Sequence, residues 1–222
     1  MKKKEFKNNP DINLECDFYN FCNSNNKLPV LSIIEERFLR SFRVSISNSI
    51  RTLVNLENDQ SYIAKFKDWA NSQDIKHVYA IIRLNLLESV AVIKLSKSLV
   101  MGIIDIMCGG NDLQGKYDYS NMEYTSIELE LIKEITDLII SDINEAWAFI
   151  EKIDAQHIRL EILSEFIGVV PPEELAHIKK YIVTFNSVSG ELELVYPYST
   201  LFPMRGKLFS MIKKNSVPNV SS

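Results

Sequence analysis

Residues 107–147 read MCGGNDLQGKYDYSNMEYTSIELELIKEITDLIISDINEAW, and this stretch decides the fold. Its second half predicts a long helix, because Thr125 and Glu128 have the spacing of a capping box, in which each side chain satisfies a backbone donor of the first turn. Apolar residues then recur at steps of three or four, which predicts a helix buried in a core. They are Ile132, Ile135, Ile139, Ile143, Ala146 and Ile150.

The glycine pair before this helix closes an earlier apolar segment, residues 99–107, which also has helical spacing. A glycine just past the last apolar residue accepts the left-handed conformation that ends a helix, so Gly109 and Gly110 predict a helix stop and an exposed loop beyond it. A loop that cradles phosphate would need further glycines or a lysine with helix-opening geometry.

The composition is that of an ordinary globular protein, with 222 residues, 46% hydrophobic and 24% charged. The formal charge of -4 gives no electrostatic reason to bind nucleic acid or an anionic membrane. No apolar run approaches the ~20 residues of a membrane span, and none follows the basic residues 2–4 as in a signal peptide. Cys16, Cys22 and Cys108 fit neither a disulfide framework nor a zinc pattern, which favours a reducing cytoplasm.

The first part of the chain predicts a polar arm followed by a second long helix. Residues 1–30 are Asn-rich and without periodicity, so we expect a mobile arm. Ser32 and Glu35 repeat the capping-box spacing, and an apolar stripe from Ile34 to Ile50 predicts a helix of about 20 residues starting at Leu31. We expect one domain over residues 31–213 and a tail over 214–222.

Segments with strand composition follow each long helix. Residues 55–61 predict a short strand, 64–71 a helical turn around Trp69, and 77–85 with 90–96 a hairpin. Residues 156–163 predict another strand, and 179–186 with 191–196 a second hairpin in which Gly190 supplies a positive φ. Because the order of helix, strand and hairpin occurs twice, we infer a duplicated α/β unit whose halves share one antiparallel sheet under the long helices.

No arrangement for catalysis or for a cofactor stands out. Nucleophile-elbow, Walker and dinucleotide-binding motifs are missing from the sequence. His77, His157 and His177 have no cysteine or carboxylate at ligand spacing, so we expect structural or surface roles and no bound metal or other cofactor. The remaining candidates have ordinary explanations: a solvated helix face for Glu128, Glu130 and Glu134, and core positions for Trp69 and Trp147.

Six stretches of the chain stand in an order and spacing known from one protein family: IIEERFLR (33–40), IIDIMCGGND (103–112), EYTSIELELI (123–132), DINEAW (142–147), GVVPPEE (168–174) and SGELELVYPYS (189–199). Through these stretches the chain, from about Tyr19 to Arg205, resembles the middle domain of the FliM family of flagellar motor switch proteins. The resemblance implies the pseudo-twofold α/β/α fold shared with the CheC-type phosphatases.

The resemblance also implies a role without catalysis. FliM middle domains stand side by side in the cytoplasmic switch ring, contact the membrane only through the basal body, and bind the rotor protein FliG through a Gly-Gly-x-Gly loop. The corresponding residues here are Gly109, Gly110, Asn111 and Asp112, with Asp112 in place of the last glycine. Implied partners are therefore FliG, neighbouring FliM copies and a FliN-type protein.

Two family features have no counterpart in the sequence. Residues 1–18 show no clear copy of the acidic-hydrophobic helix that captures the response regulator CheY, and the chain stops at Ser222, where a FliN-like β domain is expected to begin. One alternative is a CheC-type phosphatase, whose [S/D]-x-x-x-E-x-x-N motif is echoed by Ser32/Glu36 and Ser126/Glu130. Its asparagine position holds Leu39 and Lys133, neither of which positions a water, so we expect no hydrolysis. A further alternative is a reduced homologue without a role in motility.

Overall fold

The computed structural model describes residues 29–72, 77–110 and 123–208. Its six strands form one sheet in the order β1-β5-β6-β3-β2-β4, and every neighbouring pair is antiparallel. The shared antiparallel sheet is therefore confirmed. The strands are β1 (Asn55–Lys65), β2 (Val78–Leu84), β3 (Ser89–Leu95), β4 (Ala155–Glu161), β5 (Leu175–Phe185) and β6 (Val188–Pro197).

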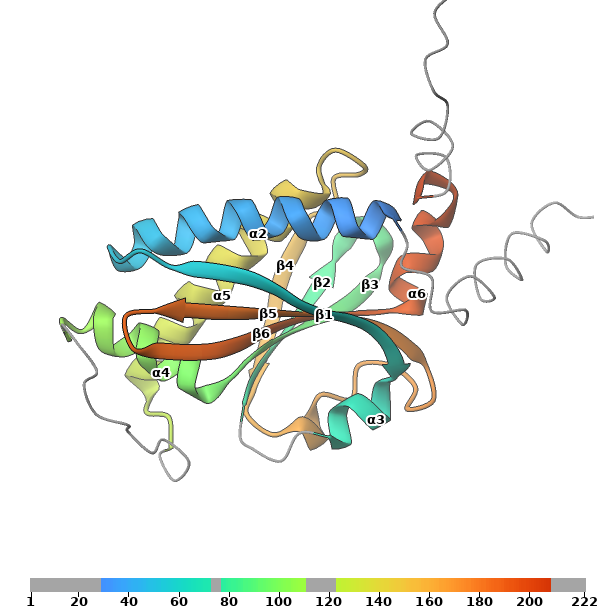
Figure 1. Ribbon diagram of the computed structural model, residues 1–222. Helices are drawn as coiled ribbons and strands as arrows, with labels where there is room; N and C mark the ends of the chain where they lie inside the picture. Colours follow the sequence, from blue (N-terminus) through green and yellow to red (C-terminus); the bar gives the residue numbers. More distant parts are fainter. Residues whose placement is uncertain (1–28, 73–76, 111–122, 209–222) are drawn as a thin grey trace, which may run out of the picture.

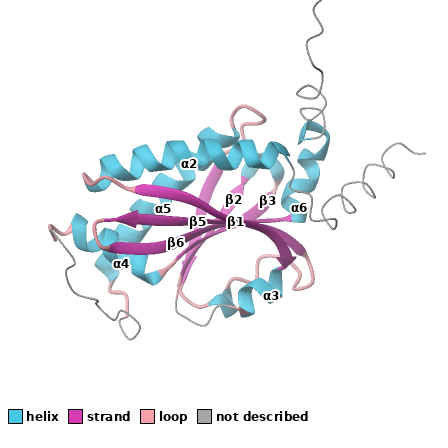
Figure 2. Cartoon of the chain, in the orientation of Figure 1, coloured by secondary structure: helices cyan, strands magenta, loops and turns pink. Residues whose placement is uncertain are grey.

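Helices cover both faces of this sheet. The two 22-residue helices, α2 (Pro29–Ile50) and α5 (Ser126–Trp147), pack together on one face with α4 (Lys97–Met107). The short helix α3 (Phe66–Asn71) lies on the other face (Figures 1 and 2). The remaining elements are α6 (Tyr198–Leu201) and the 3-10 turns η1 (Asn85–Leu87), η2 (Ser164–Phe166) and η3 (Phe202–Met204).

The strand order shows the duplication directly. Reversing it exchanges β1 with β4, β5 with β2 and β6 with β3, and the same exchange relates α2 to α5. The first strand of each half pairs with the hairpin of the other half: β1 with β5, and β4 with β2. The halves are thus interlocked in one sheet.

The core is divided by the sheet. The larger apolar cluster lies under α2, α4 and α5, and includes Phe38, Phe42 and Trp147. The smaller cluster, with Trp69, Tyr79 and Ile167, lies on the face covered by α3 and η2. Trp69 and Trp147 are 2% and 1% exposed, so both tryptophans are core residues as predicted.

The two long helices begin differently. In α5 the Thr125 side chain accepts from the Glu128 backbone N–H, and the Glu128 carboxylate accepts from the Thr125 N–H at 2.6 Å, so the predicted capping box is confirmed. The prediction of a capping box at Ser32 and Glu35 is wrong, because Ser32 lies inside the helix. Helix α2 already begins at Pro29, which suits the first turn because proline lacks an N–H there.

The conformation of Gly190 also differs from the predicted turn. It lies inside β6, paired with Val183, and has no positive φ; the turn of this hairpin instead uses Asn186, at φ 47°. A Cβ at Gly190 would lie 2.5 Å from Leu99 Cβ and 2.7 Å from Ser96 Oγ. Glycine is required here because α4 and the residue that caps it pack directly on the strand.

Both edges of the sheet are irregular. The pairing of β1 shifts register between Asn58 and Ser61, and that of β4 shifts opposite Ile81 and Ile82. Bulges of this kind bend an edge strand and disfavour pairing with a strand of another molecule. The edges of the sheet are therefore poor surfaces for strand-to-strand contact with a partner.

Candidate partner-binding site

Helix α4 ends in a motif that uses both glycines. Gly109 has φ 95°, its N–H donates to the carbonyl of Ile106, and the Gly110 N–H donates to the carbonyl of Asp105, both at 2.9 Å. These bonds satisfy carbonyl groups that the end of a helix leaves free, as in a Schellman motif. The predicted helix stop is confirmed.

The two glycines serve different purposes. Gly109 is exposed, and a Cβ there would meet no atom within 4 Å, so only its positive φ requires glycine. A Cβ at Gly110 would lie 2.1 Å from Oδ2 of Asp105 and 2.9 Å from its backbone oxygen. The chain thus leaves α4 along a path held by Asp105. Asn111 and Asp112, predicted to contact the rotor protein, lie outside the described residues, as do residues 1–28 of the predicted arm and the tail.

The exposed faces of α2 and α5 carry opposite charge. On α2, three exposed arginines accompany one glutamate: Arg37, Arg40, Arg43 and Glu36. On α5, four exposed acids accompany one lysine: Glu130, Glu134, Asp137, Glu145 and Lys133. We call these the basic face and the acidic face.

A groove of about 380 Å³ lies between the two helices. It is lined by Arg37, Arg40, Ser41, Glu145 and Ala146. At its base α2 and α5 are joined by hydrogen bonds, since Ser41 Oγ lies 2.6 Å from Oδ1 of Asp142 and 2.8 Å from Oε2 of Glu145. These contacts join residues about 100 positions apart, so no local sequence pattern predicts them.

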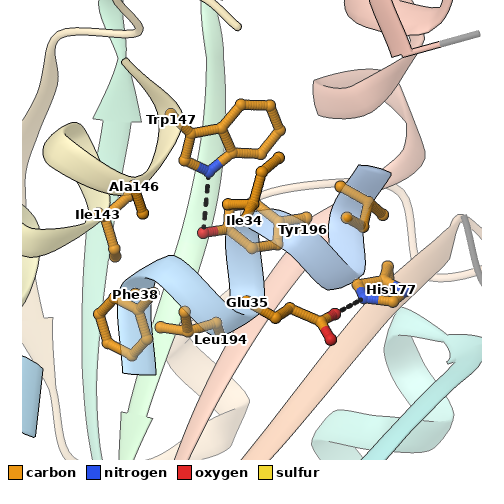
Figure 3. Close-up of a pocket in the computed structure, with 10 residues that line it drawn as sticks. Ile34, Glu35, Phe38, Ile143, Ala146, Trp147, His177, Leu194 and Tyr196 are labelled. Carbon is orange, nitrogen blue, oxygen red and sulfur yellow. Dashed lines mark hydrogen bonds and ion pairs between the residues drawn. The ribbon is translucent and has the colours of Figure 1, made fainter. Parts of the chain in front are cut away.

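A second cavity, inside the core, is too small for a substrate. Its volume is about 10 Å³, close to the space of one water molecule. Figure 3 shows Glu35 directed toward His177, with Oε1 and Nε2 2.7 Å apart, and the Trp147 N–H directed toward the Tyr196 hydroxyl. His177 is thus a buried structural residue paired with a carboxylate 142 positions away, a partner that ligand spacing could not reveal.

The other two histidines lie in environments that disfavour their charged form. Burial, with a further contribution from Lys94, lowers the pKa of His77 to about 4. Burial also lowers the pKa of His157. Within the described residues no group of three or more His, Cys, Asp or Glu side chains is arranged to hold a metal ion.

The positions that echo the phosphatase motif do not assemble a site. Glu36 is exposed and forms an ion pair with Arg40 at 3.8 Å, while Leu39 packs against the core. On α5, Glu130 and Lys133 are both exposed. Neither half therefore has an amide beside its glutamate to orient a water.

Comparison with known proteins agrees with this architecture. The family model of the flagellar motor switch protein FliM matches residues 24–212. A FliM of Caulobacter vibrioides is 26% identical over 182 residues, covering 82% of this chain and 49% of the relative. FliM of Salmonella typhimurium is 24% identical over 193 residues, covering 86% and 57%.

Solved structures share the fold. The FliM middle domain from H. pylori has a TM-score of 0.72 at 15% identity, covering 81% of this chain and 97% of that one. A chain in the FliG-FliM complex from H. pylori has a TM-score of 0.75 at 17% identity, covering 81% and 97%.

Fold and surface together define a duplicated α/β domain that presents helix faces and a glycine-ended helix. The chain belongs to the FliM family of flagellar motor switch proteins. It spans about half the length of the curated relatives that it matches, 49% and 57% of the two above. No helix among the described residues is both long and apolar enough to cross a membrane.

Proposed function

We propose that this chain is a structural component of the flagellar motor switch, which binds the rotor protein FliG and neighbouring copies of itself to transmit changes in rotation sense. The observation that carries this proposal is the family match over residues 24–212. Support for the FliG partner comes from the relative of the same fold that was solved as a FliG-FliM complex. The corresponding location is the cytoplasmic side of the flagellar basal body, without direct contact with the membrane.

The rotor contact is assigned to Gly109, Gly110, Asn111 and Asp112. Helix α4 ends at an exposed position, and the Asp105 contact with Gly110 sets the direction in which the chain continues. A preorganised start to the loop lowers the entropy lost on binding. An aspartate at the last position gives the contact a negative charge that the family's glycine lacks.

Binding of the cognate FliG tests this assignment. Asp112→Arg reverses the charge, and Gly110→Ala displaces the chain from Asp105, so each is expected to weaken the complex by about 1–3 kcal/mol. Gly168→Ala is the matched control, since a Cβ there meets no atom within 4 Å. Circular dichroism establishes that each variant is folded. Unchanged affinity in folded Asp112→Arg and Gly110→Ala would show that the glycine pair only ends the helix.

Contact between neighbouring copies is assigned to the basic face of α2 and the acidic face of α5. Contact of the basic face with the acidic face of the next copy is heterologous, and a heterologous contact generates a ring when its rotation closes. Self-association should be abolished when the charge of either face alone is reversed. The basic face is reversed by Arg37→Glu with Arg40→Glu, and the acidic face by Glu130→Lys with Glu134→Lys. Mixing the two variants should restore pairwise association in sedimentation experiments. Self-association by either reversed variant alone would contradict the assignment.

A further inference from the structure

Helix α4 contains a glycine, Gly102, in its middle, where glycine is unfavourable because it loses more conformational freedom on folding than other residues. Packing explains its presence there. A Cβ at Gly102 would lie 2.7 Å and 2.9 Å from the two methyl carbons of Val188, and 3.3 Å from Cζ of Phe185. Gly102 therefore lets α4 lie directly against the end of the hairpin formed by β5 and β6, beside which it stands in Figure 1.

The end of the hairpin is a firm support for the helix. Val188 and Phe185 are the pair next to the turn, and they are 9% and 2% exposed. A β-branched side chain has few χ1 rotamers, so both methyl groups of Val188 are held in place. The distance between α4 and the sheet at Gly102 is therefore set by this contact.

The start of α4 is bonded to the same strand. The Ser96 N–H donates to the carbonyl of Glu191 at 2.9 Å, and the Glu191 N–H donates to Ser96 Oγ at 2.8 Å. Ser98 Oγ donates to the carbonyl of Ser189 at 3.2 Å. These three bonds hold the first turn of α4 on β6, so a displacement at Gly102 tilts the helix about its start.

Such a tilt is largest at the far end of the helix, which carries the glycine pair. At about 1.5 Å per residue, Gly102 and Gly109 lie ~6 Å and ~17 Å beyond Ser98, so a shift grows about threefold between them. A Cβ at Gly102 would have to move by 0.7 Å, from 2.7 Å to the 3.4 Å of ordinary contact. The corresponding shift at Gly109 is about 2 Å, whereas a binding site must be held within about 0.5 Å.

We propose that Gly102 is a positioning residue for the rotor contact, because its contact with Val188 sets the tilt of α4 and thereby the place of Gly109 and Gly110. The inference rests on the proposed function, which assigns the glycine pair to that contact. Gly102 is buried, so it acts through the end of the helix rather than by touching the partner.

The affinity of full-chain variants for the cognate FliG tests the proposal. Gly102→Ala should bind about tenfold more weakly, although alanine favours the helix itself. Val188→Ala removes both methyl groups that the new Cβ would meet, so the double variant of Gly102→Ala with Val188→Ala should bind within about threefold of the wild type. Gly206→Ala is the matched control, since Gly206 is helical and exposed and a Cβ there meets no atom within 4 Å.

Circular dichroism and urea unfolding establish that each variant is folded. Equal affinity of folded Gly102→Ala and the wild type would overturn the proposal, as would a double variant that binds no better than Gly102→Ala. If Gly102→Ala alone does not fold, the double variant is compared with Val188→Ala, whose empty space the new methyl group fills. Weaker binding by the double variant then overturns the proposal.

Crystal structures of Gly102→Ala and of the double variant give a readout without the partner. Superposed on the sheet, α4 of Gly102→Ala should be tilted, with a shift that grows from Ser98 to Gly109, and α4 of the double variant should return to its place in the wild type. An unmoved α4 above a displaced hairpin would refute the proposal. Absence of FliG binding by the wild type would instead refute the proposed function, whatever the position of α4.

Discussion

Trp69 donates its indole N–H to Oε2 of Glu193 at 2.7 Å, which ties α3 to a strand in the middle of the sheet. The other oxygen of the carboxylate, Oε1, accepts from Lys94 Nζ at 2.9 Å. Glu193 and Lys94 are 4% and 3% exposed, so a charged pair lies within the smaller core. The indole N–H stabilises the buried Glu193 carboxylate, because a buried charge is costly unless its oxygens accept hydrogen bonds.

Trp69→Phe should destabilise the protein by more than the same change at Trp147. Both residues are almost fully buried, but the Trp147 N–H meets the neutral Tyr196 hydroxyl at 3.4 Å. A hydrogen bond to a charged group contributes about 1.5–3 kcal/mol, whereas a long neutral one contributes less. Urea unfolding of the two variants measures the difference. Equal losses of unfolding free energy in the two variants would mean that the Trp69 N–H does not stabilise the Glu193 carboxylate.

Gly190→Ala should cost about 1–3 kcal/mol of stability, because the new methyl group would overlap Leu99 Cβ and the capping Ser96 Oγ, which cannot move without shifting α4. Gly168→Ala is the control, at an exposed position with open space. Thermal or urea unfolding measures both. A Gly190→Ala protein as stable as the control would show that α4 is free to move on the sheet.

The elements that could be predicted from the sequence are those with local signals. The capping box at Thr125 and the glycine stop at Gly109 both involve residues within one or two turns, where side-chain and backbone chemistry decide the conformation. The repeated order of elements likewise revealed the duplication.

The predictions that were wrong concern residues whose environment is set by parts of the chain distant in sequence. At Ser32 the capping pattern was present, but a proline three residues earlier already starts the helix, and Glu35 pairs with His177 instead. The sequence pattern predicts a turn at Gly190, yet glycine is needed there because the strand approaches Leu99 of α4 closely. The hydrogen bond from Ser41 to Asp142 joins two helices that are far apart in the sequence, and no local pattern encodes such a contact.

Addition of the protein to a phosphorylated response regulator should leave the rate of dephosphorylation unchanged. The water-positioning place of the motif is held by Leu39, which packs on the core, and by Lys133, which has no acceptor. Phosphate release measured with increasing amounts of protein checks this expectation. An acceleration that disappears with Glu130→Ala would favour the phosphatase alternative.

His77 should make the protein sensitive to acid. Burial lowers its pKa to about 4, whereas the unfolded value is about 6.5. Between these values the unfolded state binds the proton more strongly, so stability is present above pH 6.5 and is lost as the pH falls toward 4. The full shift corresponds to about 3 kcal/mol, and we expect about 1–2 kcal/mol because the ring is partly exposed and solvent screens its charge.

This effect has the opposite sign to that of Asp142, whose raised pKa favours the folded state at low pH. The two partly cancel in the wild type, so variants are needed to separate them. His77→Phe keeps the ring contact with Tyr79 and removes the titration, and should therefore lose less stability between pH 7 and pH 5 than the wild type. His157→Phe, at a more exposed ring, should change the profile less. Identical profiles for wild type and His77→Phe in urea unfolding would show that His77 is protonated as readily in the folded as in the unfolded chain.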